Sequence, residues 1–90
     1  MTAIAHDPAS QRFNIEVDGQ TGYLEYERTG DVMVITHTIV PPAIGGRGIA
    51  GDLVRTALEL ARTEGLKVDP RCSYADGWMR KHPEYDALRA

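Results

Sequence analysis

The segment Ile44-Gly45-Gly46-Arg47-Gly48-Ile49-Ala50-Gly51 follows an apolar strand and opens an amphipathic helix. Its glycines, Gly45, Gly46, Gly48 and Gly51, are too closely spaced for a stable helix. Glycine lets neighbouring backbone N–H groups turn outward together, and the first N–H groups of a helix have no intrahelical partner. The helix dipole is positive at the same end. We therefore interpret the segment, called the glycine loop below, as a cradle for a phosphate or diphosphate.

A tight turn is the alternative interpretation, because Pro41-Pro42 and the paired glycines are common turn residues. The spacing also matches neither the G-x-G-x-x-G dinucleotide motif nor a P-loop, which would end in Gly-Lys-Ser or Gly-Lys-Thr. The context favours a binding loop, since strand, prolines, glycines and helix follow one another directly.

The composition indicates one small globular domain: 90 residues, 42% hydrophobic and 26% charged. A formal net charge of −3 argues against a general nucleic-acid-binding protein. No apolar run approaches the ~20 residues of a membrane helix, and the first seven residues lack the features of a signal peptide. The default expectation is a cytoplasmic protein without nucleic-acid or membrane partners. The single cysteine, Cys72, cannot form an intrachain disulfide.

Three strands are predicted before the glycine loop. Residues 13–17 alternate apolar and polar side chains, and Asp18-Gly19 is a strong hairpin turn. Residues 20–28 form a second strand. Residues 31–40 have apolar side chains at both odd and even positions, which predicts an interior strand covered on both faces. Together they indicate an antiparallel meander.

Helical periodicity begins after the glycine loop. Apolar residues recur at helical spacing from Arg47 to Glu64, and Gly65 is suited to a left-handed C-terminal cap. Residues 66–69 form a short strand, which a strand–helix–strand connection would place parallel to residues 31–40. Ser73 is a candidate cap for a second helix that ends near His82-Pro83.

The expected fold is therefore an α+β domain: a meander extended by one further strand, with one long and one short helix. It occupies residues 13–90, whereas residues 1–12 show no periodicity and are expected to form a flexible leader. The strand at 13–17 would leave an exposed edge.

Four groups of residues together resemble a known family. They are His37-Thr38-x-Val40-Pro41-Pro42, then Gly45-Gly46-Arg47-Gly48-Ile49-Ala50, then Gly65-Leu66-Lys67-Val68 with Pro70-x-Cys72-Ser73-Tyr74, and finally His82-Pro83-Glu84-Tyr85. Their order and spacing resemble the small, single-domain branch of the GNAT superfamily, the GCN5-like N-acetyltransferase-domain-containing proteins. The resemblance covers residues 13–85 and implies a minimal GNAT-like fold that binds acetyl-CoA.

The resemblance also implies where coenzyme A binds. Backbone amides of Arg47 to Gly51 would hold its diphosphate, and the strand at 31–40 would contact its pantetheine arm. The family loop begins with Arg or Gln where this chain has Gly45, which removes a side chain but not the amides. A basic helix end at residues 80–83 can hold phosphate or adenine, although a proline there is also a normal helix terminator. The candidate cofactor-binding residues are Val40, Gly45, Gly46, Arg47, Gly48, Ile49, Ala50, Gly51, Arg80, Lys81, His82 and Pro83.

Two side chains are candidate catalytic groups. His37 can accept a proton near neutral pH, but it can equally be a structural histidine of the sheet. Cys72 follows a strand end, where Arg71 would favour the thiolate, or it can be a small buried hydrophobe. In the family branch, a direct part in acetyl transfer has been proposed for a cysteine at the matching position.

The predicted function is acetyl-CoA-dependent N-acetyl transfer to a primary amine, either on a small polyamine-like molecule or on a protein. The amine attacks acetyl-CoA directly, with His37 or water taking the proton, or Cys72 is acetylated first. One alternative is a non-catalytic CoA-binding sensor or interaction module, and another is a loop for a different phosphate compound. No metal-ligand spacing is present, and a monomer is the default oligomeric state.

Overall fold

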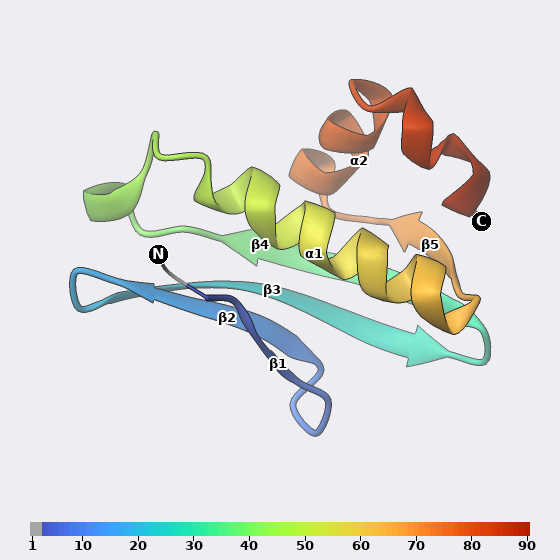
Figure 1. Cartoon of the computed structure of the whole chain (residues 1–90), viewed down its shortest axis with the longest axis horizontal. Helices are drawn as coiled ribbons and strands as arrows, with labels where there is room; N and C mark the ends of the chain where they lie inside the picture. The colour runs from blue at the N-terminus through green and yellow to red at the C-terminus, as the bar shows by residue number, and fades with distance from the viewer. Residues whose placement is uncertain (1–2) are drawn as a thin grey trace.

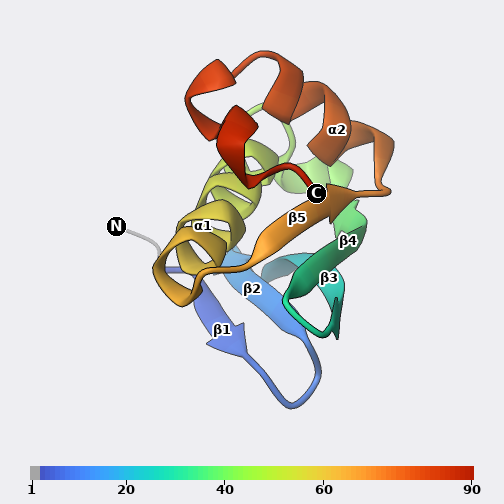
Figure 2. The same ribbon diagram turned by 90° about the vertical axis from the view of Figure 1, so that its right-hand side faces the viewer.

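The computed structural model describes residues 3–90 and contains a five-stranded sheet with both α-helices packed on one face (Figure 1, Figure 2). Its elements are β1 (Ala5–Asp7), β2 (Arg12–Val17), β3 (Gln20–Thr29), β4 (Val32–Ile39), the 3-10 turn η1 (Pro42–Ile44), α1 (Ile49–Glu64), β5 (Lys67–Pro70), α2 (Ser73–Arg80) and the 3-10 segment η2 (Pro83–Leu88). The strand order is β1-β2-β3-β4-β5, antiparallel as far as β4 and parallel between β4 and β5. The predicted α+β class and the parallel fifth strand are confirmed.

The core lies between α1 and the sheet. Strand side chains on this side, such as Phe13, Leu24 and Ile35, are buried. Helix α1 buries the face formed by Ile49, Leu53, Val54, Ala57, Leu58 and Ala61, which recur at helical spacing. Gly65 ends the helix in the predicted left-handed conformation, with φ of 72° and its N–H directed to carbonyls of the last turn. Neither helix in the described part of the chain is long and apolar enough to cross a membrane.

The predicted leader contains an edge strand. Residues Ala5–Asp7 pair antiparallel with β2, so the prediction of a loose segment is wrong over these three residues. The edge of β2 is consequently covered from Arg12 to Asn14, whereas Ile15 to Val17 pair with no residue of β1. The imidazole of His6 stacks on the ring of Phe13 at 4.3 Å, which helps to hold this short strand. Residues 1–2 of the predicted leader lie outside the described residues.

Strand β4 is interior in the sheet but is covered on one face only, so the prediction of two covered faces is wrong. All helices lie on the same side of the sheet (Figure 2). Val32 and Val34, which point to the other side, are only half-buried, whereas Met33 and Ile35 are fully buried.

A β-bulge in β4 helps to explain why apolar residues occur at both odd and even positions of this strand. Tyr26 pairs with Ile35 and Glu25 pairs with His37, so Thr36 is an extra residue. One extra residue reverses which side chains face the helices. After the bulge, the half-buried side chain is therefore Thr38, and His37 is exposed.

Candidate functional site

The glycine loop connects β4 to α1 and is exposed from Gly45 to Gly48. Gly46 and Gly48 have φ values of 77° and 78°, a left-handed conformation that side chains other than glycine rarely adopt. Because Gly48 is the N-cap of α1, the helix begins at Ile49 rather than at the predicted Arg47.

The amide groups from Gly46 to Gly51 have no hydrogen-bond partner within residues 3–90. The first hydrogen bond of α1 runs from the N–H of Asp52 to the carbonyl of Gly48, at 3.1 Å, and no side chain caps the helix. The N–H groups of Ile44 and Gly45 differ, because they donate to the carbonyls of Pro41 and Pro42, at 3.1 Å each. Free helix-start amides at the positive end of a helix dipole are an arrangement suited to an anion.

Two residues of the loop have additional structural contacts. The guanidinium of Arg47 pairs with the carboxylate of Asp18 in the β2–β3 turn at 2.9 Å, so part of its charge is already neutralised. A Cβ added to Gly51 would lie 3.1 Å from Nε1 of Trp78 and 3.5 Å from the hydroxyl of Tyr74. Glycine at this position therefore lets α2 approach the first turn of α1, a reason that the sequence alone did not suggest.

The two parallel strands separate beside the glycine loop. They pair from Val32 and Lys67 to Ile35 and Pro70. The N–H groups of the next two residues after β5 both donate to the carbonyl of Ile35, at 3.0 Å each, and the chain then turns into α2. Strand β4 continues to Ile39 without a β5 partner, and Figure 1 shows it leading to the glycine loop while β5 leads to α2. The second half of β4, with Val40 after it, thus borders an opening between the strands.

Cys72 lies at the point where β5 gives way to α2 and is the N-cap residue of α2. Its half-buried Sγ lies 3.6 Å from Oγ1 of Thr38 on β4. Burial alone would raise the pKa of the thiol, but the backbone N–H of Ala75, the Thr38 hydroxyl and the N–H of Tyr74 together outweigh it, so the pKa lies below that of an ordinary cysteine. A role of the Thr38 side chain could not be predicted from the sequence, because the bulge that turns it toward Cys72 has no signal in composition.

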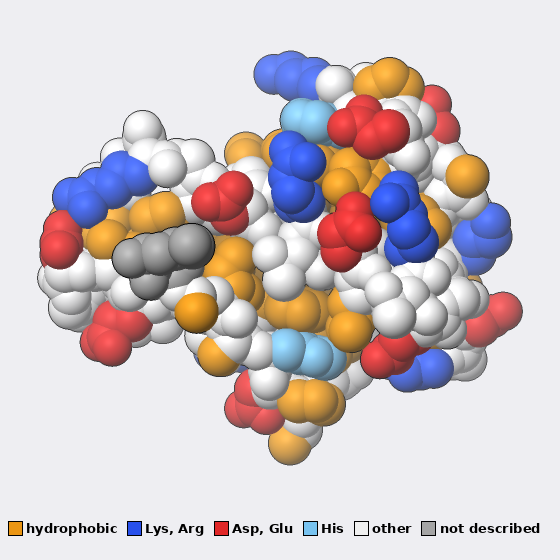
Figure 3. All heavy atoms as spheres, in the orientation of Figure 1, with side chains coloured by type: hydrophobic (Ala, Val, Ile, Leu, Met, Phe, Trp, Pro, Cys, Tyr) orange, Lys and Arg blue, Asp and Glu red, His pale blue; other side chains and the backbone are white. Residues whose placement is uncertain are grey.

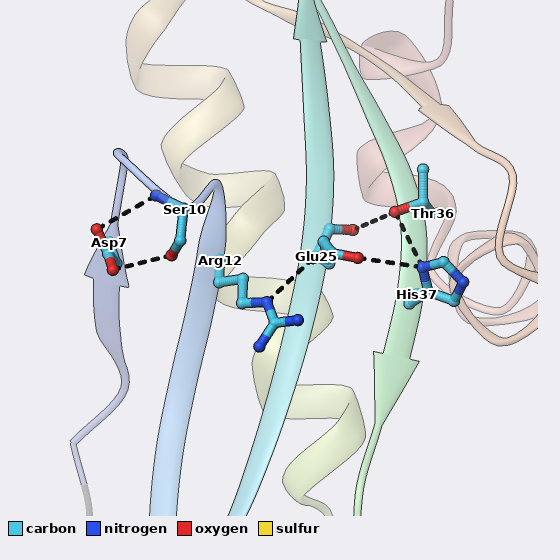
Figure 4. A network of polar contacts seen from close by, with 6 residues as sticks. All are labelled: Asp7, Ser10, Arg12, Glu25, Thr36 and His37. Atoms are coloured by element: carbon cyan, nitrogen blue, oxygen red, sulfur yellow. Dashed lines mark hydrogen bonds and ion pairs between the residues drawn. The ribbon is translucent and has the colours of Figure 1, made fainter.

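His37 lies on the open face of the sheet, away from Cys72. Its Nδ1 is 3.4 Å from a carboxylate oxygen of Glu25 and 3.2 Å from the hydroxyl of Thr36, and Glu25 also pairs with Arg12 at 3.0 Å (Figure 4). The imidazole side chain is 60% exposed. The two predicted catalytic residues are therefore not brought together.

The predicted basic helix end is largely engaged in contacts within the protein. Arg80 pairs with Asp76 at 3.1 Å. The ring of His82 stacks on Trp78 at 3.6 Å, and its Nδ1–H donates to the Trp78 carbonyl at 2.7 Å. Lys81 is exposed and Pro83 begins η2. A part for these residues in cofactor binding stays a prediction.

The surface carries no large basic area on the face that Figure 3 shows, since Lys and Arg side chains are interspersed with Asp and Glu. Within residues 3–90, no three His, Cys, Asp or Glu side chains are grouped so that they could hold a metal ion. An anionic ligand at the glycine loop would therefore depend mainly on backbone amides.

Comparison with known proteins identifies close resemblances along almost the whole chain. Residues 12–88 match the family model of the GCN5-related N-acetyltransferases. Protein NATD1 of Mus musculus and of Homo sapiens is 34% identical over 83 residues, which cover 89% of this chain and 76% or 74% of the relative. Protein NATD1 of Danio rerio is 33% identical over 87 residues, covering 91% and 79%. The solution structure of a GCN5-like protein from Staphylococcus aureus is similar, with a TM-score of 0.78 and 25% identity, covering 98% of this chain and 87% of the other.

Proposed function

Because this chain belongs to the GCN5-related N-acetyltransferase family, we propose that it transfers an acetyl group from acetyl-CoA to a primary amine. The observation that carries the proposal is the run of unpartnered amides from Gly46 to Gly51 at the start of α1. The loop is exposed from Gly45 to Gly48, so the first amides of this run are accessible to a diphosphate.

The residues present fit coenzyme A in two further respects. The left-handed glycines Gly46 and Gly48 carry no Cβ that would obstruct an approaching ligand. The free edge of β4 from His37 to Ile39 offers backbone groups to an extended, amide-containing arm such as pantetheine. Acetyl-CoA supplies an acyl group already activated as a thioester. A backbone N–H of the same strand would stabilise the negative charge that develops on its carbonyl oxygen.

Two routes for the acetyl group are compatible with this site. In the first, the neutral acceptor amine attacks the thioester carbonyl, the C–S bond breaks, and coenzyme A leaves as a thiol while the amine loses one proton; the protein contributes orientation and charge stabilisation. In the second, the Cys72 thiolate accepts the acetyl group, coenzyme A leaves with a proton on its sulfur, and the amine then removes the acetyl group from Cys72. The lowered pKa of the thiol and its place beside the strand opening support a part for Cys72. His37 is less suited to act on the same group, because it lies on the other face of the sheet.

Mass measurement of the intact protein after incubation with acetyl-CoA, without an acceptor, tests these routes. Cys72 is the only cysteine, so a thioester-linked acetyl group that is absent in Cys72→Ala identifies the second route. A protein that stays unmodified but releases coenzyme A when amines are added follows the first. Firm coenzyme A binding with no release for any amine, polyamine or peptide N-terminus would instead favour the non-catalytic CoA-binding module, and the proposal of catalysis would then be withdrawn.

A further inference from the structure

A cavity of about 210 Å³ lies at the opposite end of α1 from the glycine loop. Its lining comes from the N-terminal hairpin, from β3 and β4, and from the end of α1, including His6, Gln11, Tyr26, Met33, Leu60 and Glu64. Figure 2 looks onto this end of the molecule, with β1 beside the C-terminal end of α1. Helix α1 has 16 residues and spans about 24 Å at ~1.5 Å per residue. A ligand in this cavity is therefore remote from the glycine loop.

The cavity combines an apolar floor with a polar wall. Met33 and Leu66 are buried core residues and Leu60 is half-buried, so a ligand body meets hydrocarbon there. On the wall, the hydroxyl of Tyr26 lies 2.6 Å from Nε2 of His6. In either imidazole tautomer the phenol oxygen keeps a free lone pair, so it can accept a hydrogen bond from a ligand.

One solvent-exposed ion pair forms part of the cavity lining. Arg28 and Glu64 meet at 3.3 Å, and their side chains are 50% and 43% exposed. Arg28 also donates through Nε to the carbonyl of Gly30, which orients it toward the β3–β4 turn. Exposed pairs of this kind contribute little to stability, so a cationic ligand can replace Arg28 at Glu64 at small cost.

The electrostatic surroundings favour a cation over an anion. Burial is the largest cause of the raised pKa of Tyr26, and among charges Glu64 raises it more than Arg28 lowers it, with Asp7 adding to the increase. Two carboxylates, those of Glu64 and Asp7, thus act on the Tyr26 hydroxyl against one guanidinium, that of Arg28. Leu60 and Glu64 belong to the last turns of α1, where the helix dipole is also negative. Gln11 adds a carbonyl oxygen, which already accepts the N–H of Arg28 and has a second lone pair.

We propose that this cavity is a second binding site, for a small primary amine with an apolar body. The ammonium group contacts Glu64, Tyr26 and Gln11, and the apolar body lies on Met33, Leu60 and Leu66. The site is separate from acetyl transfer: an amine held here is not positioned for acetylation, and it connects the N-terminal hairpin to α1. This inference does not depend on the proposed function.

The test is a titration of the ¹⁵N-labelled protein, followed by amide chemical shifts, with 2-phenylethylamine and with 3-phenylpropionate, which has a similar body and the opposite charge. We expect saturable shifts around Gln11, Arg28 and Leu66 with the amine at concentrations up to about 10 mM, and weaker or no shifts with the carboxylate. Equal or tighter binding of the carboxylate, or no saturable shift near the cavity, overturns the proposal. Shifts confined to the glycine loop and Cys72 overturn it as well.

Variants make the assignment specific. Glu64→Gln keeps the shape of the side chain and should weaken amine binding by at least about fivefold, because a charge-assisted hydrogen bond is lost. Glu27→Gln removes a charge from an exposed position of β3 outside the cavity and should leave binding unchanged. Leu60→Phe should fill the cavity and abolish binding, with thermal unfolding as the check that the fold is intact. Wild-type affinity in Glu64→Gln would contradict the proposed ammonium contact.

Discussion

Replacement of Gly46 by aspartate or by asparagine tests directly whether a diphosphate binds at the glycine loop. Gly46 has a φ of 77°, and an added Cβ would meet nothing within 4 Å. Aspartate and asparagine tolerate the left-handed conformation better than other side chains, so both variants should fold with a similar backbone cost of about 1 kcal/mol. They have the same shape and differ by one negative charge.

The expected difference in coenzyme A affinity follows from Coulomb's law. The amides of Gly46 to Gly48 lie in the exposed part of the loop, so a diphosphate bound there would lie about 6 Å from the new carboxylate. Two phosphate charges at this distance raise the binding free energy by about 1.4 kcal/mol at an effective dielectric constant of ~80, and by about 2.8 kcal/mol at ~40. Gly46→Asp should therefore bind coenzyme A about 10- to 100-fold more weakly than Gly46→Asn.

Isothermal titration calorimetry at about 0.1 M and 1 M salt measures this difference, which should shrink at the higher salt because the Debye length falls from about 10 Å to 3 Å. The matched control is Gly30, which also has a left-handed φ, of 62°, and open space around its Cβ, but lies in the β3–β4 turn. Gly30→Asp and Gly30→Asn should bind equally. Equal affinities of the two Gly46 variants would refute the placement of the diphosphate.

Further predictions concern the thiol and the packing of α2. The alkylation rate of Cys72 should rise with pH around a midpoint below that of an ordinary cysteine, and Thr38→Val should move this midpoint upward, because the hydroxyl stabilises the thiolate. A midpoint that falls or stays unchanged in Thr38→Val would contradict a stabilising contact between the hydroxyl and the thiolate. Gly77→Ala should raise the unfolding free energy by about 0.5–1 kcal/mol through helix propensity, and with it the thermal midpoint, since no atom lies within 4 Å of its Cβ position. Gly51→Ala should gain less or lose stability, because its Cβ would lie 3.1 Å from Trp78. Trp78→Ala should lower the unfolding free energy by about 3–5 kcal/mol, measured by urea denaturation, and a loss under about 1 kcal/mol would argue against its place in the core.

Features encoded by local residue chemistry could be predicted from the sequence. The Asp18-Gly19 turn, the left-handed cap at Gly65 and the apolar spacing of α1 each depend on residues close together in the chain. The parallel pairing of β5 followed from the handedness rule for strand–helix–strand units. The free amides of the glycine loop were expected for the same kind of reason, since the start of a helix leaves its first N–H groups unpaired.

Features that depend on pairing between distant segments could not be predicted. Strand β1 has only three residues, and it is held by its partner β2 and by the packing of His6 rather than by its own propensity. The bulge at Thr36 leaves no mark in composition, yet it decides which face His37 occupies. The sequence therefore identified the free amides of the glycine loop, but it could not show that His37 lies on the open face of the sheet.

The extra residue in β4 changes the face of the sheet on which each later side chain of that strand lies. If β4 kept all its residues but lost the bulge, regular alternation from Ile35 would bring the His37 imidazole to the helix side and turn the Thr38 hydroxyl outward. The bulge thus decides whether a hydroxyl or an imidazole lies on the same side of the sheet as the Cys72 thiol. The surroundings of the thiol can therefore change without replacement of Cys72.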